Sequence, residues 1–203
     1  MLIDLAKIHC QAGKGGAGCI SFRREKYVPK GGPDGGDGGK GGDVWLEVGA
    51  HVRTLLDCRE QPQYKANPGR PGSGNNKTGR NGDDLIIKVP RGTVVKDLES
   101  GEVIADMLKV GDRFCAARGG KGGRGNARFA TPTHQAPRIA DPGMGGEERM
   151  VELELKLIAE MQARRGTGVL FITHDFGVVA EIAHRVAVMQ KVRVVETGPV
   201  GEI

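Results

Sequence analysis

Lysine and arginine are the residues in this sequence whose types and spacing indicate chemistry, because they gather in and beside glycine-rich tracts. Residues 21–30 place cations and two aromatic side chains directly before the tract 31–42, which reads GGPDGGDGGKGG. Cations in this setting favour binding to the phosphates of a polyanion over binding to a membrane. The candidate residues are Arg23, Arg24, Lys26, Lys30, Lys40, Arg70, Lys77, Arg80, Lys121, Arg124 and Arg128. Phosphate contacts predict an affinity that falls with salt and little base specificity.

Other interpretations of these residues remain open. Each lone cation can be a solvated surface charge. The run 23–26, Arg-Arg-Glu-Lys, can instead be an internal ion-pair network that pins a sheet to its neighbour. The aromatic residues Tyr27 and Phe129 either stack on bases or lie in a core that has few aromatic side chains, since these make up only 4% of the chain.

The acidic and cysteine residues do not form a recognisable metal motif. Asp34, Asp37 and Asp43 are carboxylates separated by glycine, but the EF-hand pattern with its bidentate Glu is absent. The cysteines contain no CxxC pair, so reduced thiols are expected in place of zinc ligands. They are Cys10, Cys19, Cys58 and Cys115. We therefore predict that the chain binds no metal.

The glycines recur at every third position. This spacing is neither the 3.6 of a helix nor the 2 of a strand, but it is the repeat of polyproline II. If one face of each segment is glycine, backbones can pack against backbones, and we predict five or six such segments in a bundle. The structural glycines are Gly32, Gly35, Gly38, Gly41, Gly119, Gly122 and Gly125. Collagen needs longer runs, and a flexible linker does not keep a fixed period.

Short strands are predicted between the glycine tracts. Alternating or apolar stretches at 1–9, 19–22, 44–48, 53–58, 85–89, 93–96, 103–106, 113–117 and 151–157 predict them. Residues 61–84 read as a long polar loop, which in a compact domain implies a function. The fold class is therefore mostly β: a small β-barrel or sandwich carrying a bundle of glycine-rich polyproline II helices, followed by a short α/β fragment.

The composition changes after residue 159. Residues 1–159 contain 29 of the 34 glycines and the whole net charge of +5. Residues 160–203 have α/β character, including a hairpin over 185–190 and 192–196, and are too few for an independent domain. The chain shows neither a leader pattern nor an apolar stretch of eighteen residues, so we expect a cytoplasmic protein.

Residues 1–159 contain six distinctive motifs: SFRREK at 21–26, VPKGGPDGGDGGKGGDV at 28–44, KVPRGTVV at 88–95, ARGGKGGRGN at 117–126, FATPT at 129–133 and LELKL at 153–157. Together they closely resemble the amino-terminal domain of the Obg family of ribosome-associated GTPases. The resemblance implies the Obg fold and a role in assembly of the large ribosomal subunit, with glycine-rich loops on ribosomal RNA. We also expect a monomer that binds neither DNA nor membranes.

The P-loop of that family, GxxxxGK[ST], is not found in this sequence. Lys14, Lys40 and Lys121 are each followed by glycine, so no lysine and hydroxyl are placed for the phosphates and magnesium. The family uses GTP and magnesium, but we expect this chain to bind no cofactor and to hydrolyse no GTP. The alternative function is that of a truncated or fused nucleotide-binding protein.

Residues 160–203 resemble a different family. TGVLFITHD at 167–175, AHRVAVM at 183–189 and VETG at 195–198 are similar to the end of a peptide-importer ABC-transporter ATPase. The resemblance implies that His174 matches the switch histidine that senses the γ-phosphate. We expect this histidine to be vestigial, because no Walker A, signature or Walker B motif accompanies it. A fusion, a frameshift or an artefact would explain such a fragment.

Overall fold

The computed structural model describes residues 5–26, 31–156, 185–190 and 193–199, and the chain divides into two units, Met1–Leu155 and Lys156–Ile203. In the second unit, strands β9 (Arg185–Gln190) and β10 (Arg193–Pro199) pair antiparallel, which confirms the predicted hairpin. His174 lies outside the described residues, as do Tyr27 and Lys30. None of the described helices is long and apolar enough to span a bilayer.

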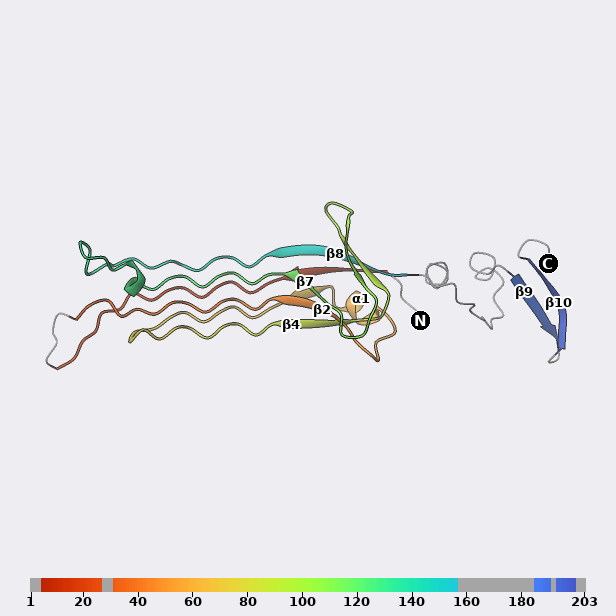
Figure 1. The fold of residues 1–203 in the computed structure, drawn as a ribbon, viewed down its shortest axis with the longest axis horizontal. Helices are drawn as coiled ribbons and strands as arrows, with labels where there is room; N and C mark the ends of the chain where they lie inside the picture. The colour runs from red at the N-terminus through yellow and green to blue at the C-terminus, as the bar shows by residue number, and fades with distance from the viewer. Residues whose placement is uncertain (1–4, 27–30, 157–184, 191–192, 200–203) are drawn as a thin grey trace. The chain divides into compact units, whose positions relative to one another are not determined.

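The first unit is built on two β-sheets (Figure 1). One has the strand order β3-β1-β8-β5-β6 and the other β4-β2-β7. The elements are β1 (Leu5–Gln11), β2 (Val44–Val48), α1 (Leu56–Glu60), β3 (Gln63–Lys65), β4 (Leu85–Val89), β5 (Thr93–Asp97), β6 (Val103–Met107), β7 (Arg113–Ala117), the 3₁₀ helix η1 (Asn126–Phe129) and β8 (Glu148–Leu155). The predicted mostly-β fold is therefore confirmed.

Side chains from both sheets form one hydrophobic core. On β2 the buried residues Val44, Leu46 and Val48 alternate with half-buried ones, as a strand with one face on a core requires. Ile8 on β1 and Leu153 on β8 are fully buried in the same cluster. Aliphatic side chains thus separate the two layers at this end of the unit, as in a β-sandwich.

Two predicted strands are wrong. Residues 53–58 lead into helix α1 instead, because Leu55 and Cys58, three residues apart, both turn into the core at helical spacing. Residues 19–22 make only an isolated bridge between Phe22 and Pro33. The stretch 61–84 is not an unstructured loop, since it contains β3 and two of the extended segments described next.

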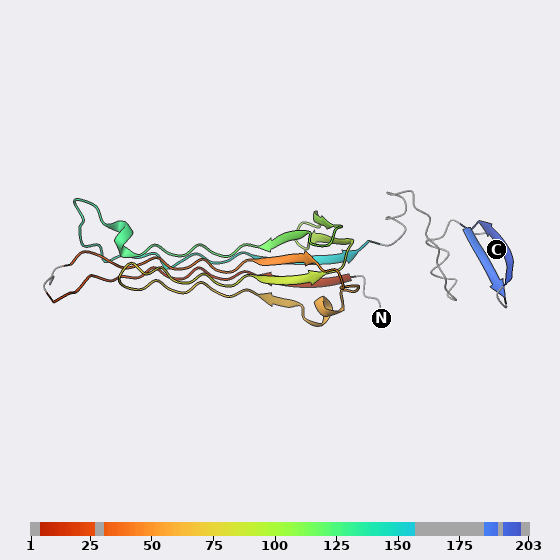
Figure 2. The same ribbon diagram turned by 60° about the horizontal axis from the view of Figure 1, so that its bottom comes forward.

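Six extended segments, here called ribs, continue six of the strands away from the core (Figures 1 and 2). They are rib A (12–19) after β1, rib B (34–43) before β2, rib C (66–73) after β3, rib D (77–84) before β4, rib E (118–126) after β7 and rib F (140–147) before β8. Ribs C, A and F therefore keep the order β3-β1-β8, and ribs D, B and E keep the order β4-β2-β7. The two layers of the sandwich become two layers of ribs.

Hydrogen bonds join the ribs at every third residue. Gly15 N–H donates to the carbonyl of Met144 at 2.9 Å within one layer, and Gly16 N–H donates to Gly39 O at 2.8 Å across the layers. Gly123 N–H on rib E in turn donates to Gly16 O at 2.8 Å. Bonds between segments at this period are what the polyproline II interpretation requires, since such a helix has no internal hydrogen bonds.

Glycine is required where neighbouring ribs touch, within a layer and across the layers, because no side chain fits between them. A Cβ added at any of six predicted structural glycines would lie only 1.9–2.1 Å from a backbone carbonyl oxygen of another rib. These six are Gly35, Gly38, Gly41, Gly119, Gly122 and Gly125. The core of the ribbed half is therefore made of backbone.

The prediction for Gly32 is wrong. A Cβ at this position would meet nothing within 4 Å, because Gly32 lies in the loop before rib B. A second row that the sequence prediction did not assign, Gly36, Gly39 and Gly42, packs against rib D at 2.1–2.2 Å. Rib B needs glycine at two of every three positions because it has neighbours on two sides.

Candidate nucleic-acid interface

The ribs end, away from the sheets, in three connections, here together called the tip (Figure 1). Their described residues are 20–26 and 31–33 between ribs A and B, 74–76 between C and D, and 127–139 between E and F. In the second connection, Asn75 and Asn76 adopt φ values of 60° and 56°, which asparagine tolerates better than most residues. Asp34 fixes this turn by accepting bonds from the backbone N–H of both asparagines, at 3.0 and 2.6 Å.

Asn126 holds the tip together, and the sequence analysis missed it. Its side chain is fully buried, and its Oδ1 accepts the N–H of Gly35 at 2.9 Å. Its Nδ2 donates to the carbonyls of Ser21 at 2.9 Å and Pro137 at 3.1 Å. The available signal was that asparagine ends the series of Gly120 and Gly123, where a third glycine would be expected.

Nine of the eleven candidate cations fall into two groups. Five form ion pairs: Arg23–Glu25 at 2.9 Å, Lys40–Asp43 at 2.7 Å, Arg80–Asp83 at 3.3 Å, Arg124–Asp141 at 2.7 Å and Arg128–Asp37 at 2.5 Å. Arg24, Arg70, Lys77 and Lys121 are exposed and form no ion pair among the described residues. Lys26 is exposed as well. The interpretation of the run 23–26 as a network therefore applies at least to Arg23 and Glu25.

Rib register explains why Lys121 keeps its charge uncompensated. On rib F, Glu147, Met144 and Asp141 donate their N–H groups to the carbonyls of residues 118, 121 and 124 of rib E. Arg124 thus lies beside Asp141, whereas Lys121 lies beside the apolar Met144. Three further exposed cations lie in the ribbed half and were not among the predicted site residues: Lys14, Arg118 and Arg138.

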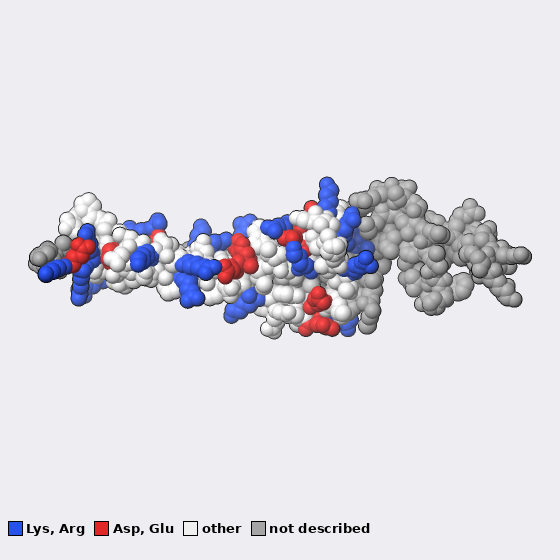
Figure 3. Space-filling view, turned by 90° about the horizontal axis from the view of Figure 1, so that it is seen from below, with Lys and Arg blue, Asp and Glu red and all other residues white. Residues whose placement is uncertain are grey.

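The structure spreads the candidate residues over the length of the ribs. Arg23, Arg24, Lys26, Lys77 and Arg128 lie at or beside the tip, and Lys40, Arg70, Arg80, Lys121 and Arg124 follow ribs B to E toward the sheets. Figure 3 shows Lys and Arg side chains along one face of the ribbed half, with Asp and Glu between them. Because ribs B to E are rich in glycine, these side chains project from a thin support.

The aspartates considered as metal ligands accept backbone hydrogen bonds. Asp37 Oδ1 accepts Gly125 N–H at 2.9 Å, and Asp43 Oδ1 accepts Gly119 N–H at 2.6 Å. Gly119 and Gly125 donate to no backbone carbonyl among the described residues, so these carboxylates satisfy their N–H groups. Across residues 5–26 and 31–156, the structure contains no group of three or more His, Cys, Asp or Glu side chains suited to a metal ion.

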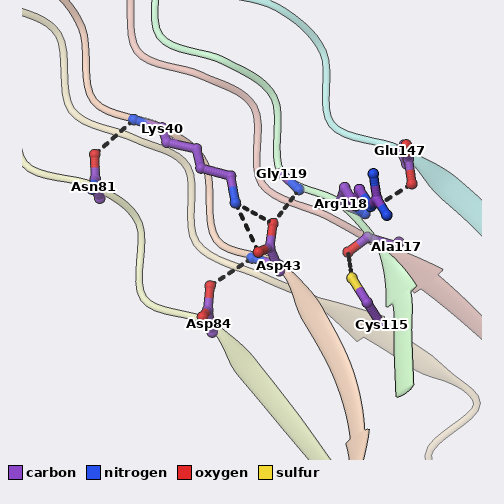
Figure 4. A network of polar contacts seen from close by, with 9 residues as sticks. All are labelled: Lys40, Asp43, Asn81, Asp84, Cys115, Ala117, Arg118, Gly119 and Glu147. Atoms are coloured by element: carbon purple, nitrogen blue, oxygen red, sulfur yellow. Dashed lines mark hydrogen bonds and ion pairs between the residues drawn. The ribbon is translucent and has the colours of Figure 1, made fainter. Parts of the chain in front are cut away.

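Asp43 is the centre of the junction where ribs B, D and E meet the sheet (Figure 4). Both of its oxygens accept Lys40 Nζ at 2.7 Å, and its own N–H donates to Asp84 Oδ1 at 2.8 Å. Burial raises the pKa of Asp43, but the hydrogen bonds from Lys40 and Gly119 outweigh it and hold that pKa below its ordinary value. The ionised carboxylate therefore stabilises the junction.

Replacing Asp43 with Asn should lower the free energy of unfolding at pH 7 by about 1.5 kcal/mol, because the charged acceptor for Lys40 is lost. Since the pKa of Asp43 is lowered by folding, its contribution is present above about pH 4 and disappears as the pH falls through the folded-state pKa. Urea unfolding of both proteins should show the difference shrinking in acid. A difference that stays constant at low pH would count against this role. Asp83→Asn, in an exposed pair, is the control.

Comparisons with known proteins support these observations. Residues 3–157 match the family model GTP1/OBG. A GTPase Obg from Thermodesulfovibrio yellowstonii is 62% identical over 159 residues, covering 78% of this chain and 47% of the relative. A GTPase Obg from Persephonella marina is 60% identical over 159 residues with the same coverage, and one from Sulfurihydrogenibium sp. is 58% identical over 161 residues, 79% of this chain and 46% of the relative.

The chain spans about half the length of these curated relatives. The family match ends at residue 157, and nothing in these comparisons supports the resemblance of residues 160–203 to an ABC-transporter ATPase. Over its first three quarters, in contrast, the fold, the glycine motifs and the sequence identity agree. The chain belongs to the GTP1/OBG family.

Proposed function

We propose that this chain binds RNA of the large ribosomal subunit through the uncompensated cations of its ribs and tip. The observation that carries the proposal is that Arg24, Arg70, Lys77 and Lys121 are exposed, without an ion pair among the described residues, on a scaffold fixed by backbone packing. Such cations are free to exchange their counterions for RNA phosphates. Ribosomal RNA is chosen because the family resemblance implies a ribosomal role.

The backbone core of the ribs supports binding in a narrow RNA cavity. Where Gly38 of rib B packs against Gly16 of rib A, no side chain separates the two layers, so the ribbed half is thinner than the sandwich. Its inter-rib hydrogen bonds are formed before binding, so less conformational entropy is lost than with flexible loops. A thin, rigid and basic structure suits a cleft lined by phosphates.

The proposal is tested by sedimentation with large ribosomal subunits over a range of salt concentrations. The variant Arg24→Gln, Arg70→Gln, Lys77→Gln, Lys121→Gln removes four uncompensated cations. The plot of log affinity against log salt should become shallower by about three, since each phosphate contact contributes about 0.7 to 0.9 to the slope. Affinity at moderate salt should fall at least about tenfold.

The matched control removes four exposed cations from the sheet end of the unit. It is Arg53→Gln, Arg59→Gln, Lys65→Gln, Lys109→Gln. The control loses the same total charge but keeps all the cations of the ribs. Its plot of log affinity against log salt should therefore keep the wild-type slope. If both variants weaken binding alike, general charge explains the affinity. If the wild type does not sediment with subunits even at low salt, RNA binding is excluded.

A nucleotide-linked role is the second candidate, and membership of a family whose relatives are named GTPases favours it. We infer that GTP hydrolysis in those relatives depends on sequence outside the matched half, because this chain contains no GxxxxGK[ST] motif. Thermal unfolding with GTP and magnesium tests this. A rise in melting temperature on adding nucleotide would favour the second candidate.

A further inference from the structure

We propose that the guanidinium plane of Arg124 is a stacking platform for an unpaired RNA base. The inference rests on the proposed RNA binding and adds a contact to a base where the cations above supply only contacts to phosphates. It concerns a residue whose charge is already neutralised within the chain. Arg124 was expected to lie on a phosphate, and the geometry assigns it a different use.

Three observations describe how the Arg124 side chain is held and exposed. Its Cζ lies over the Phe129 ring, 4.7 Å from the centroid, so the ring packs against the guanidinium. Its Nε donates to Asp141 Oδ2 at 2.7 Å, which holds one edge. The side chain is still 59% exposed, so the plane is held on two sides and open to solvent elsewhere. The sequence left open whether Phe129 stacks on bases or lies in the core; in the structure it is half-buried beneath Arg124.

The helix η1 places Phe129 under Arg124. Residues 126–129 turn back at the end of rib E, so the ring returns to a residue five positions earlier. Both ends of this turn are anchored, because Asn126 is buried in the tip and Arg128 pairs with Asp37. The platform is therefore set before any ligand arrives, which reduces the entropy lost on binding.

Charge explains why a base suits this site better than a phosphate. Asp141 compensates Arg124, so a phosphate there would be repelled by the carboxylate, whereas a base has a neutral face. Arginine planes and aromatic rings are the surfaces on which proteins stack unpaired RNA bases. Two exposed apolar side chains, Ile20 at 51% and Ile139 at 57%, lie at the same end of the ribs.

The test uses the full chain and a short single-stranded oligoribonucleotide with one 2-aminopurine, alongside the same oligonucleotide with an abasic site. Wild-type protein should quench the 2-aminopurine and prefer the base-containing probe by about tenfold, as expected for one stacked base. Arg124→Lys keeps the charge but loses the plane, so it should abolish the quench and the preference. Its affinity for the abasic probe should stay within about threefold of wild type.

Two further variants make the result specific. Phe129→Leu removes the support under Arg124 and should reduce the preference in the same direction, which keeps the proposal testable if Arg124→Lys folds poorly. Arg118→Lys is the matched control, since it lies on the same rib six residues away and no aromatic ring contacts it among the described residues. It should leave the quench unchanged.

The outcomes separate this proposal from RNA binding itself. If wild type binds both probes equally and Arg124→Lys matches it, the stacking platform is wrong while RNA binding stands. If wild type binds neither probe nor ribosomal subunits, both proposals are wrong. If Arg124 instead contacts a protein partner, wild type and Arg124→Lys should likewise bind both probes equally, and the stacking proposal is wrong.

Discussion

Replacing Gly41 with Ala should destabilise the ribbed half by at least ~3 kcal/mol, at the upper end of what overpacking costs. A Cβ at Gly41 would lie 1.9 Å from Gly13 O and 2.3 Å from Gly13 C. These are backbone atoms of rib A, and Gly13 is itself bonded to Gly42 O, so neither rib can move away alone. Urea unfolding followed by fluorescence of Trp45, the single tryptophan, reports the change because β2 continues rib B.

The matched controls for this variant are Gly32→Ala and Gly145→Ala. Neither Cβ would meet a heavy atom within 4 Å, and neither glycine has a φ in the left-handed region. Both variants should unfold within about 0.5 kcal/mol of wild type, as surface substitutions usually do. Equal destabilisation by all three alanines would mean that glycine acts through chain flexibility and not through contact between ribs.

Replacing Asn126 with Asp should loosen the packing of the tip and lower the free energy of unfolding by about 3 kcal/mol or more. The reason is that two carbonyls bonded by the Asn126 amide lose their donors. The carboxylate can still accept Gly35 N–H, but it cannot donate to Ser21 O or Pro137 O, and it faces both oxygens at short range. We expect faster amide exchange of Gly35 and Asn126 and weaker binding to ribosomal subunits, with the sandwich core intact.

Asn81→Asp is the control for this change. Asn81 is exposed, and its Oδ1 accepts Lys40 N–H at 2.8 Å, a bond that a carboxylate keeps. Stability and exchange should therefore stay close to wild type. Should Asn126→Asp leave the exchange of Gly35 unaltered, the three connections of the tip are held by something other than this amide.

The period of the glycines predicted the ribs because three-residue spacing is a local property of the chain. The same locality explains the successful strands: alternation over 44–48 reports which face is buried without reference to a partner. It also explains the error at Gly32, which continues the repeat in sequence although rib B begins only at Asp34. A period shows that a segment can pack, but not where its partner begins.

The order of the ribs was not predictable from local pattern. Strands β1 and β8 pair across more than a hundred residues, and β2 pairs with β4 and β7, which no spacing in one segment encodes. Because the ribs follow the order of the strands, the residues beside each cation could not be predicted from local sequence either. Lys121 and Arg124 look alike in sequence, yet only Arg124 lies beside an acid.

Two ion pairs of the candidate site could have been predicted from the spacing of charges in the sequence. Lys40–Asp43 and Arg80–Asp83 are three residues apart, and side chains three apart share a face of a polyproline II segment. Applying the period to the charges as well as to the glycines would have found both pairs. Asn126 would have been found in the opposite way, as the position where the three-residue repeat of glycine is interrupted by another residue.

Amide hydrogen exchange along rib A tests most directly whether the ribs are packed backbone to backbone. Gly13, Gly15, Gly16 and Gly18 all donate to ribs B or F, whereas the structure gives no acceptor for the N–H of Lys14 or Ala17 among the described residues. The predicted result is a repeat of two protected amides and one rapidly exchanging amide. Uniformly fast exchange along residues 12–19, or protection at every second residue, would contradict it.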